Sequence, residues 1–187
     1  MDSLQIENEQ YKVEFRKVNI VAGSPNDIHD YLVSYNFAED NELTSSLEVI
    51  CKVNETQKKC VIHAGFVAIN LNKHSAFILN DSVFLAIGNE VCKIQLPNLA
   101  LMWRTKSDTS ACFGLYPASE QDYIIVHGEC EISRLNLMGK IEWQASGKDI
   151  FTEGFEIFPT QIEVIDFNFE KYRIDLSSGN IASQKGG

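Results

Sequence analysis

The sequence lacks the features of several protein classes. Its first residues, MDSLQIENEQ, contain neither the basic nor the apolar region of a secretory signal. The longest apolar runs, CVIHAGFVAI and SVFLAIG, are far shorter than the roughly 20 residues that span a bilayer. We therefore expect a cytoplasmic protein that is not a membrane protein.

Positive charge is also scarce, with 16 Lys and Arg against 26 Asp and Glu and a net charge of −10. Because nucleic acids and anionic membrane surfaces are bound through Lys and Arg, neither is an expected partner. A basic protein would instead be attracted by such a chain. The same acidity can serve solubility alone, so it indicates a class of partner without showing that one exists.

Cysteine usage excludes the commonest cysteine-based sites. The five cysteines form no CxxC pair and none is adjacent to another, and an odd number fits a reducing compartment. Cys51 and Cys60 lie on the arms of a predicted hairpin, and pairing outward from a turn at 54–57 places them opposite each other, with Val49 opposite Ile62. Because no second ligand pair exists for zinc, we expect free buried thiols rather than a disulfide or a metal site.

The sequence lacks the common motifs of nucleotide-binding proteins, serine hydrolases and zinc proteases. These motifs are GxxxxGK[ST], GxGxxG, GxSxG and HExxH. We therefore assign no catalytic, cofactor-binding or metal-ligating residue. The sequence does contain many strand signals, and no stretch shows a capped helical period of 3.6 residues. We expect an all-β fold of antiparallel sheets, whose strands before residue 72 are 12–20, 29–37, 47–53 and 58–66.

From about Phe77 onward the pattern repeats about every 40 residues. A motif of a basic residue, an aliphatic residue, a polar residue and Leu begins at Lys93, Arg134 and Arg173. Each motif follows an apolar strand and an acidic turn, and another turn and strand follow it. Four short antiparallel strands are the unit of a propeller blade, so we expect three blade-like repeats. Their approximate bounds are 76–110, 111–149 and 150–187, and their first strands contain Phe77, Phe113 and Phe155.

The repeat resembles that of quinoprotein-type (PQQ-like) β-propellers. The resemblance is carried by KIQLPNLALMW (93–103), RLNLMGKIEW (134–143) and RIDLSSGNIAS (173–183). In that family a strand ends in x-Leu-Asp, a Thr-Gly turn follows, and the next strand closes on Trp. Gly139 and Trp143 match the middle copy and Trp103 the first, whereas the third has Ser183 in place of Trp. The resemblance implies propeller-like blades and assigns no activity.

The departures from that family are as informative as the matches. Its enzymes close a ring of six to eight blades and hold their cofactor with adjacent cysteines and calcium-binding carboxylates, neither of which we find, so we expect no quinone or other cofactor. An incomplete or atypical propeller is the expected architecture, with a β-sandwich as the alternative. Open blades expose strand edges, which soluble proteins avoid. Either residues 1–72 cover or extend the repeats of residues 73–187 in one compact domain, or copies associate through open sheet edges.

Residues that recur at one repeat position are interpreted as structural. Trp103 and Trp143 lie 40 residues apart, and each can bury a large apolar area between blades while its indole N–H finds a partner. The recurring basic residues are expected to cover a neighbouring sheet with their stems rather than to form a basic binding stripe. The motif leucines of the three copies are Leu96, Leu137 and Leu176.

One polar group is a candidate site. His127 precedes Glu129 by two residues, and Asp166 lies near the matching place in the next repeat. Such a group can act as a carboxylate-supported base or bind a metal, although scattered polar residues on an acidic surface are the competing interpretation. A further acidic stretch, interpreted as a solvated face or a docking surface, comprises Asp149, Glu153, Glu156 and Glu163.

These observations favour a non-enzymatic interaction or scaffold protein whose partner is another protein, with a basic partner favoured by charge. An acidic inhibitor or immunity-type protein is one version of this hypothesis. The alternative is a small-ligand-binding or hydrolytic protein with a pocket at His127. A third hypothesis is a module that completes a ring by self-association.

Overall fold

The structure is a computed structural model that describes residues 2–19, 31–38, 45–65, 69–118 and 122–182 of the 187-residue chain. Within these ranges all regular secondary structure is β-strand, which confirms the all-β prediction. The strands form four separate sheets, named here sheet A, blade B, blade C and blade D in chain order. None of the described residues forms a helix that could cross a membrane.

Sheet A is built from the first part of the chain. Its strands are β1 (Ser3–Glu7), β2 (Lys12–Val18), β3 (Val33–Asn36), β4 (Ser45–Val53) and β5 (Thr56–Ala64). Their spatial order is β1-β2-β4-β5-β3, and β3 runs parallel to β5 while the other pairs are antiparallel. The sequence did not predict β1, and the strand expected at 29–37 is limited to β3 among the residues that the structure describes.

The register predicted for the β4–β5 hairpin is wrong. Cys60 lies opposite Val49, and Cys51 lies opposite Lys58. The predicted register assumed a four-residue turn, whereas the observed turn has only two central residues, the first of which is Asn54 with a φ of 50°. Such tight turns favour Asn at positive φ and fix the register of both strands. Both cysteines are buried free thiols, as expected.

Blades B, C and D are up-and-down antiparallel sheets. Blade B contains β6 (Ala76–Leu79), β7 (Ser82–Ile87), β8 (Glu90–Gln95) and β9 (Ala100–Lys106). Blade C contains β10 (Cys112–Pro117), β11 (Tyr123–Gly128), β12 (Glu131–Asn136) and β13 (Ile141–Ser146). Blade D contains β14 (Gly154–Ile157), β15 (Gln161–Ile165) and β16 (Lys171–Asp175). In place of the expected fourth strand, the described part of blade D has an isolated bridge between Ile174 and Ile181; Ser183 lies outside the described residues.

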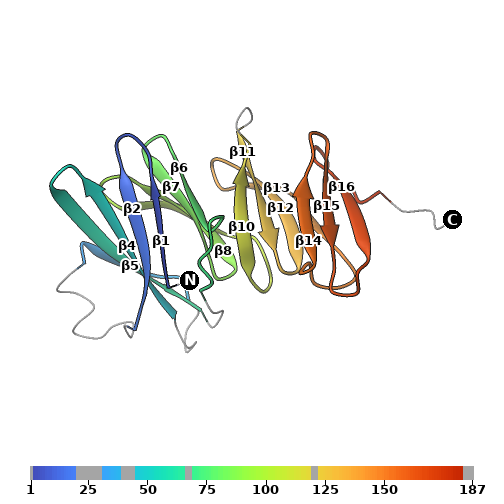
Figure 1. The fold of residues 1–187 in the computed structure, drawn as a ribbon, viewed down its shortest axis with the longest axis horizontal. Coiled ribbons are helices and arrows are strands. Elements are labelled where there is room, and N and C mark those ends of the chain that lie inside the picture. Colours follow the sequence, from blue (N-terminus) through green and yellow to red (C-terminus); the bar gives the residue numbers. More distant parts are fainter. Residues whose placement is uncertain (1, 20–30, 39–44, 66–68, 119–121, 183–187) are drawn as a thin grey trace.

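The four sheets stand side by side in one open row, with sheet A at one end and blade D at the other (Figure 1). Apolar side chains fill each of the three spaces between neighbouring sheets, so each sheet is stabilised by burying a face against the next. Representative core pairs are Phe15 and Leu85 between sheet A and blade B, Phe84 and Leu135 between B and C, and Ile125 and Ile162 between C and D.

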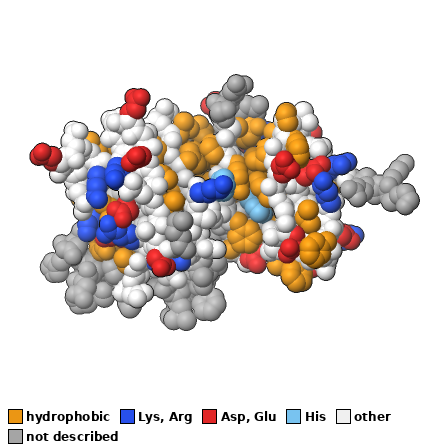
Figure 2. Space-filling view, in the orientation of Figure 1, with side chains coloured by type: hydrophobic (Ala, Val, Ile, Leu, Met, Phe, Trp, Pro, Cys, Tyr) orange, Lys and Arg blue, Asp and Glu red, His pale blue; other side chains and the backbone are white. Residues whose placement is uncertain are grey.

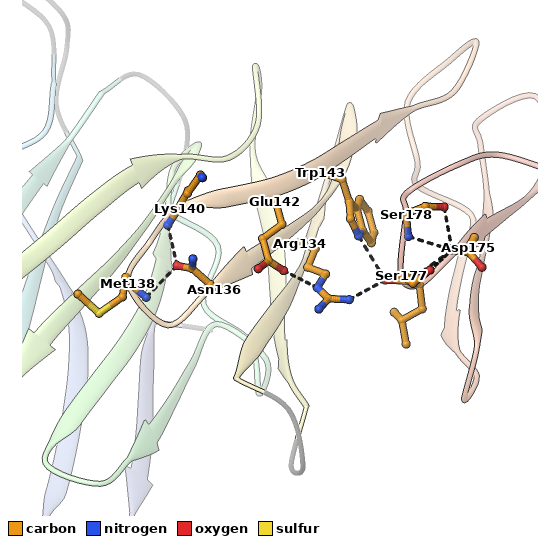
Figure 3. A network of polar contacts seen from close by, with 10 residues as sticks. Arg134, Asn136, Met138, Lys140, Glu142, Trp143, Asp175, Ser177 and Ser178 are labelled. Carbon is orange, nitrogen blue, oxygen red and sulfur yellow. Dashed lines mark hydrogen bonds and ion pairs between the residues drawn. The ribbon is translucent and has the colours of Figure 1, made fainter.

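The two tryptophans lie at equivalent junctions between blades. The Trp103 indole N–H donates to the Leu137 carbonyl at 3.1 Å, and the Trp143 N–H donates to the Leu176 carbonyl at 3.2 Å. Each ring lies against the turn glycine of the following blade, which is Gly139 for Trp103. Figure 3 shows that Arg134 donates to the same carbonyl as Trp143, at 3.0 Å. Two donors from blade C therefore converge on one turn of blade D.

Sheet A makes the corresponding contact with blade B through a tyrosine. The Tyr35 hydroxyl donates to the Leu99 carbonyl and accepts the Leu101 N–H, each at 2.9 Å. Leu99 belongs to the β8–β9 turn, which is the equivalent of the turns that receive the tryptophans. Sheet A therefore stands where a preceding blade would stand, although its strand order differs from that of a blade.

Replacing Gly139 by alanine should lower the free energy of unfolding by about 2–4 kcal/mol. Gly139 has a φ of 80°, and an added Cβ would lie 2.6 Å from a carbon of the Trp103 ring. Gly88→Ala is a matched control, because Gly88 has a φ of 60° but its added Cβ would meet only Ala64, at 3.8 Å. Urea unfolding of both variants separates backbone strain from the clash, and equal losses would contradict the close packing of Trp103 on this turn.

The outer face of blade D is polar where the earlier blades are apolar. The cross-strand neighbour of the motif's basic residue is Phe84 in blade B and Ile125 in blade C, each 1% exposed. In blade D the same position holds Glu163, which forms ion pairs with Lys171 and with Arg173. A polar outer face is typical of the terminal unit of a stacked array. This face therefore disfavours the stacking of a further blade, while association through strand edges stays a prediction.

Candidate functional site

His127 belongs to β11 and is partly buried beside two aromatic rings. Its ring stacks on Phe155 at a centroid distance of 4.3 Å and meets the edge of Phe113 at 5.3 Å. Its Nε2–H donates to the Phe151 carbonyl at 3.1 Å. Burial lowers the pKa of His127 to about 4, and the hydrogen bond to the Phe151 carbonyl opposes this shift. The imidazole is therefore neutral at pH 7, with one nitrogen already engaged.

The other two predicted site residues have partners of their own. Glu129 accepts a hydrogen bond from the Ser110 hydroxyl, within the junction between blades B and C. Asp166 is buried in the β15–β16 turn, where it accepts the Tyr172 hydroxyl at 2.8 Å. The hydrogen bonds found among the described residues do not join His127, Glu129 and Asp166 to one another. In that part of the chain no group of three His, Cys, Asp or Glu side chains is placed to hold a metal ion.

Instead, His127 belongs to a row of rings that links the three blades. Tyr116 lies 4.6 Å from His74 and 4.7 Å from Phe155, measured between ring centroids. With Phe113 and His127 these residues connect the segment before β6 to β10, β11 and β14. Figure 2 shows hydrophobic and histidine side chains in the middle of the visible face of the molecule, with most acidic and basic side chains nearer its two ends. Packing within this row of aromatic rings therefore accounts for the position of His127.

One edge of the three blades is strongly acidic and is named here the acidic end. It is formed by the β7–β8, β11–β12 and β15–β16 turns and by the loops that connect successive blades. These segments and the strand residues next to them contain three lysines, Lys106, Lys148 and Lys171. Their carboxylates are those of Glu90, Asp108, Glu129, Glu131, Asp149, Glu153, Asp166 and Glu170. Glu156 and Glu163 of the predicted acidic stretch lie instead within the strands of blade D.

The acidic end is held together by its own carboxylates. Asp108 accepts backbone N–H groups from Ser110, Cys130 and Glu131 at 2.6, 3.0 and 2.8 Å, which ties the B–C loop to the β11–β12 turn. Burial raises the pKa of Asp108, and the charge of Glu129 adds to this effect. Burial also raises the pKa of Glu131, together with the charge of Asp108. The negative charges are therefore close enough to repel one another and are kept in place by the fold.

The β15–β16 turn places two phenylalanines in solvent at this end. Phe167 is 58% exposed and Phe169 is 75% exposed. The Phe167 N–H donates to the Ile150 carbonyl at 2.8 Å, and the Asn168 side-chain amide donates to Asp149 at 2.6 Å. The turn is thus fixed to the C–D loop. This pair is not predicted from the sequence, because phenylalanine usually indicates core and no local pattern marks these two as exposed.

Comparison with known proteins supports the fold and gives no family. The chain matches no protein-family model and no curated protein. A solved structure of HIRA(644–1017) is 11% identical with a TM-score of 0.51, and the match covers 96% of this chain and 51% of that chain. The chain thus spans about half the length of that fragment. The computationally designed Ika4 protein is 8% identical with a TM-score of 0.47, over 65% of this chain and 78% of that protein. The fold is propeller-like; the narrower PQQ-like resemblance stays a prediction.

Proposed function

We propose that this chain is a non-enzymatic protein-binding module whose acidic end docks a basic partner. The concentration of eight carboxylates against three lysines at this end is the observation that supports the proposal. Loops held on a rigid scaffold commonly carry binding residues. Complementary charge raises the association rate and disfavours partners of the wrong sign. An acidic inhibitor or immunity-type protein that masks a basic enzyme or toxin is one specific version.

The geometry gives less support to a hydrolytic or ligand-binding site at His127. A general base must reach the proton that it removes from a substrate. The ring stacks on Phe155 and makes a T-shaped contact with Phe113, and Nε2 donates to a backbone carbonyl. These contacts favour a packing role.

Affinity capture on matched charge variants tests the proposed function. Glu153 is exposed at the acidic end, and Asp122 is exposed at the opposite end of blade C. We expect the wild-type chain to retain basic proteins from a lysate of its source organism and to release them when salt rises well above about 0.15 M. Glu153→Lys should weaken this retention, while Asp122→Lys, which makes the same change of net charge, should preserve it. Equal retention by all three chains at every salt concentration would contradict docking at the acidic end.

A further inference from the structure

Phe169 is an unfavourable residue for its position. Its side chain is 75% exposed, and its backbone has a φ of 64°, in the left-handed region. Bulky residues rarely adopt this conformation, whereas glycine and asparagine tolerate it. The phenylalanine therefore adds backbone strain and leaves a large apolar surface in water. Folding alone would favour a small or polar residue here.

The strained conformation is nevertheless held firmly. The Phe169 N–H donates to the Asp166 carbonyl at 2.9 Å. The Asp166 carboxylate accepts the N–H groups of Asn168 and Glu170, each at 2.9 Å, and the Tyr172 hydroxyl. Several hydrogen bonds thus fix the backbone of a turn whose phenyl ring is mostly exposed. Strained residues that the surrounding structure holds in this way cluster at binding sites.

The other blades show that the fold does not require a phenylalanine here. The equivalent β7–β8 turn of blade B uses Gly88 at a φ of 60°, which relieves the strain. The equivalent β11–β12 turn of blade C consists of Glu129 and Cys130. Only blade D, among the three described turns, presents phenyl rings to solvent.

We propose that Phe169, assisted by Phe167, is the apolar anchor that inserts into a pocket on a basic protein partner. This inference rests on the proposed function. An aromatic anchor inside a charged rim is the usual anatomy of a binding hot spot. Here the rim includes the carboxylates of Glu153 and Glu170 on the adjacent loop and the same turn. Its two lysines are both paired, Lys148 with Glu170 at 2.9 Å and Lys171 with Glu163. The rim selects a basic surface, and a preorganised turn lowers the entropy lost on binding.

The first test separates the anchor from a structural residue. Phe169→Gly removes the exposed ring and relieves the positive φ, so the Tm should stay unchanged or rise by about 2 °C. Phe167→Ser should also leave the Tm within about 2 °C, since its ring is 58% exposed. A fall of more than about 4 °C for Phe169→Gly would show that the ring stabilises the fold and would overturn the anchor role.

The second test uses a phage-displayed library of random 12-residue peptides selected on the wild-type chain. We expect enriched peptides to combine Lys and Arg with an aromatic or aliphatic residue. Synthetic versions of these peptides should bind the Phe169→Gly chain about tenfold more weakly or worse. Met138→Ser is the matched control, because Met138 is also highly exposed but lies at the opposite end of blade C. That variant should bind as the wild type does.

The outcomes distinguish this inference from the proposed function. Basic peptides without an apolar residue, binding wild type and Phe169→Gly equally, would overturn the anchor and leave charge-driven docking standing. Peptides without basic enrichment would overturn both. An equal loss of affinity in Phe169→Gly and Met138→Ser would also overturn the anchor, because the effect would not be specific to the turn.

Discussion

Trp143→Ala should lower the free energy of unfolding by about 3–5 kcal/mol, one of the two largest effects that we expect. The indole joins blades C and D: Figure 3 shows its N–H directed at blade D, where it donates to the Leu176 carbonyl. Its ring also lies on Gly179. The substitution leaves a cavity between the blades and removes one of the two donors to that carbonyl; Arg134 is the other. Urea denaturation followed by circular dichroism measures the loss.

Two further variants show how much of this loss comes from the N–H donor and whether the equivalent tryptophan behaves alike. Trp143→Phe keeps most of the apolar area and loses only the N–H donor, so it should cost about 1 kcal/mol plus a small packing loss. Trp103→Ala should resemble Trp143→Ala, because Trp103 makes the equivalent contact with blade C. A Trp143→Ala chain that unfolds at the wild-type urea concentration would contradict the packing of blade D on blade C.

Acidification should destabilise the fold through His127, and this is the second large effect. Its folded-state pKa is about 4, below the ordinary value of 6.5, so the neutral form favours the folded state. The stabilisation is complete above about pH 6.5 and is lost as pH falls toward 4. At 1.36 kcal/mol per pH unit, His127 alone should remove about 2 kcal/mol between pH 7 and pH 5. Unfolding free energies measured across this interval report the loss.

His127→Phe is the control that isolates this titration. It keeps an aromatic ring between Phe113 and Phe155 and cannot be protonated. Burial also lowers the pKa of His74, which adds a loss of the same sign in both chains. Buried carboxyls with raised pKa values, such as Asp108, act in the opposite direction and are common to both chains. An unchanged pH dependence in His127→Phe would show that His127 is not the group responsible.

Much of the fold was predictable because its structural repeat corresponds to a repeat in the sequence. Blades B, C and D share a motif at a nearly constant spacing, and two of them share a tryptophan, so equivalent residues could be matched by position alone. Sheet A has no such repeat. Its local pattern indicated strands but did not show that β3 pairs in parallel with β5, or that Tyr35 contacts blade B, since both depend on segments distant in sequence. The two-residue turn at Asn54 likewise decided a register that the apolar pattern left open.

The candidate site was harder to predict than the fold. The sequence marks His127 as a polar residue two positions before Glu129, but its chemistry is set by partial burial against Phe113 and Phe155, which come from other strands. The acidity of the chain was plain from composition, whereas its concentration at one end follows from the alternation of strand directions. The exposure and positive φ of Phe169 are properties of the folded turn, and no residue pattern in the sequence encodes them.

Amide hydrogen exchange of the chain with and without a captured basic partner tests the docking surface most directly. Slowed exchange should centre on the β15–β16 turn at 166–170 and on the C–D loop at 147–153, because the hydrogen bonds between these segments place them together at the acidic end. Slowed exchange confined to the opposite turns, around 137–140 and 176–179, or to the inner strand β10, would contradict binding through the acidic end.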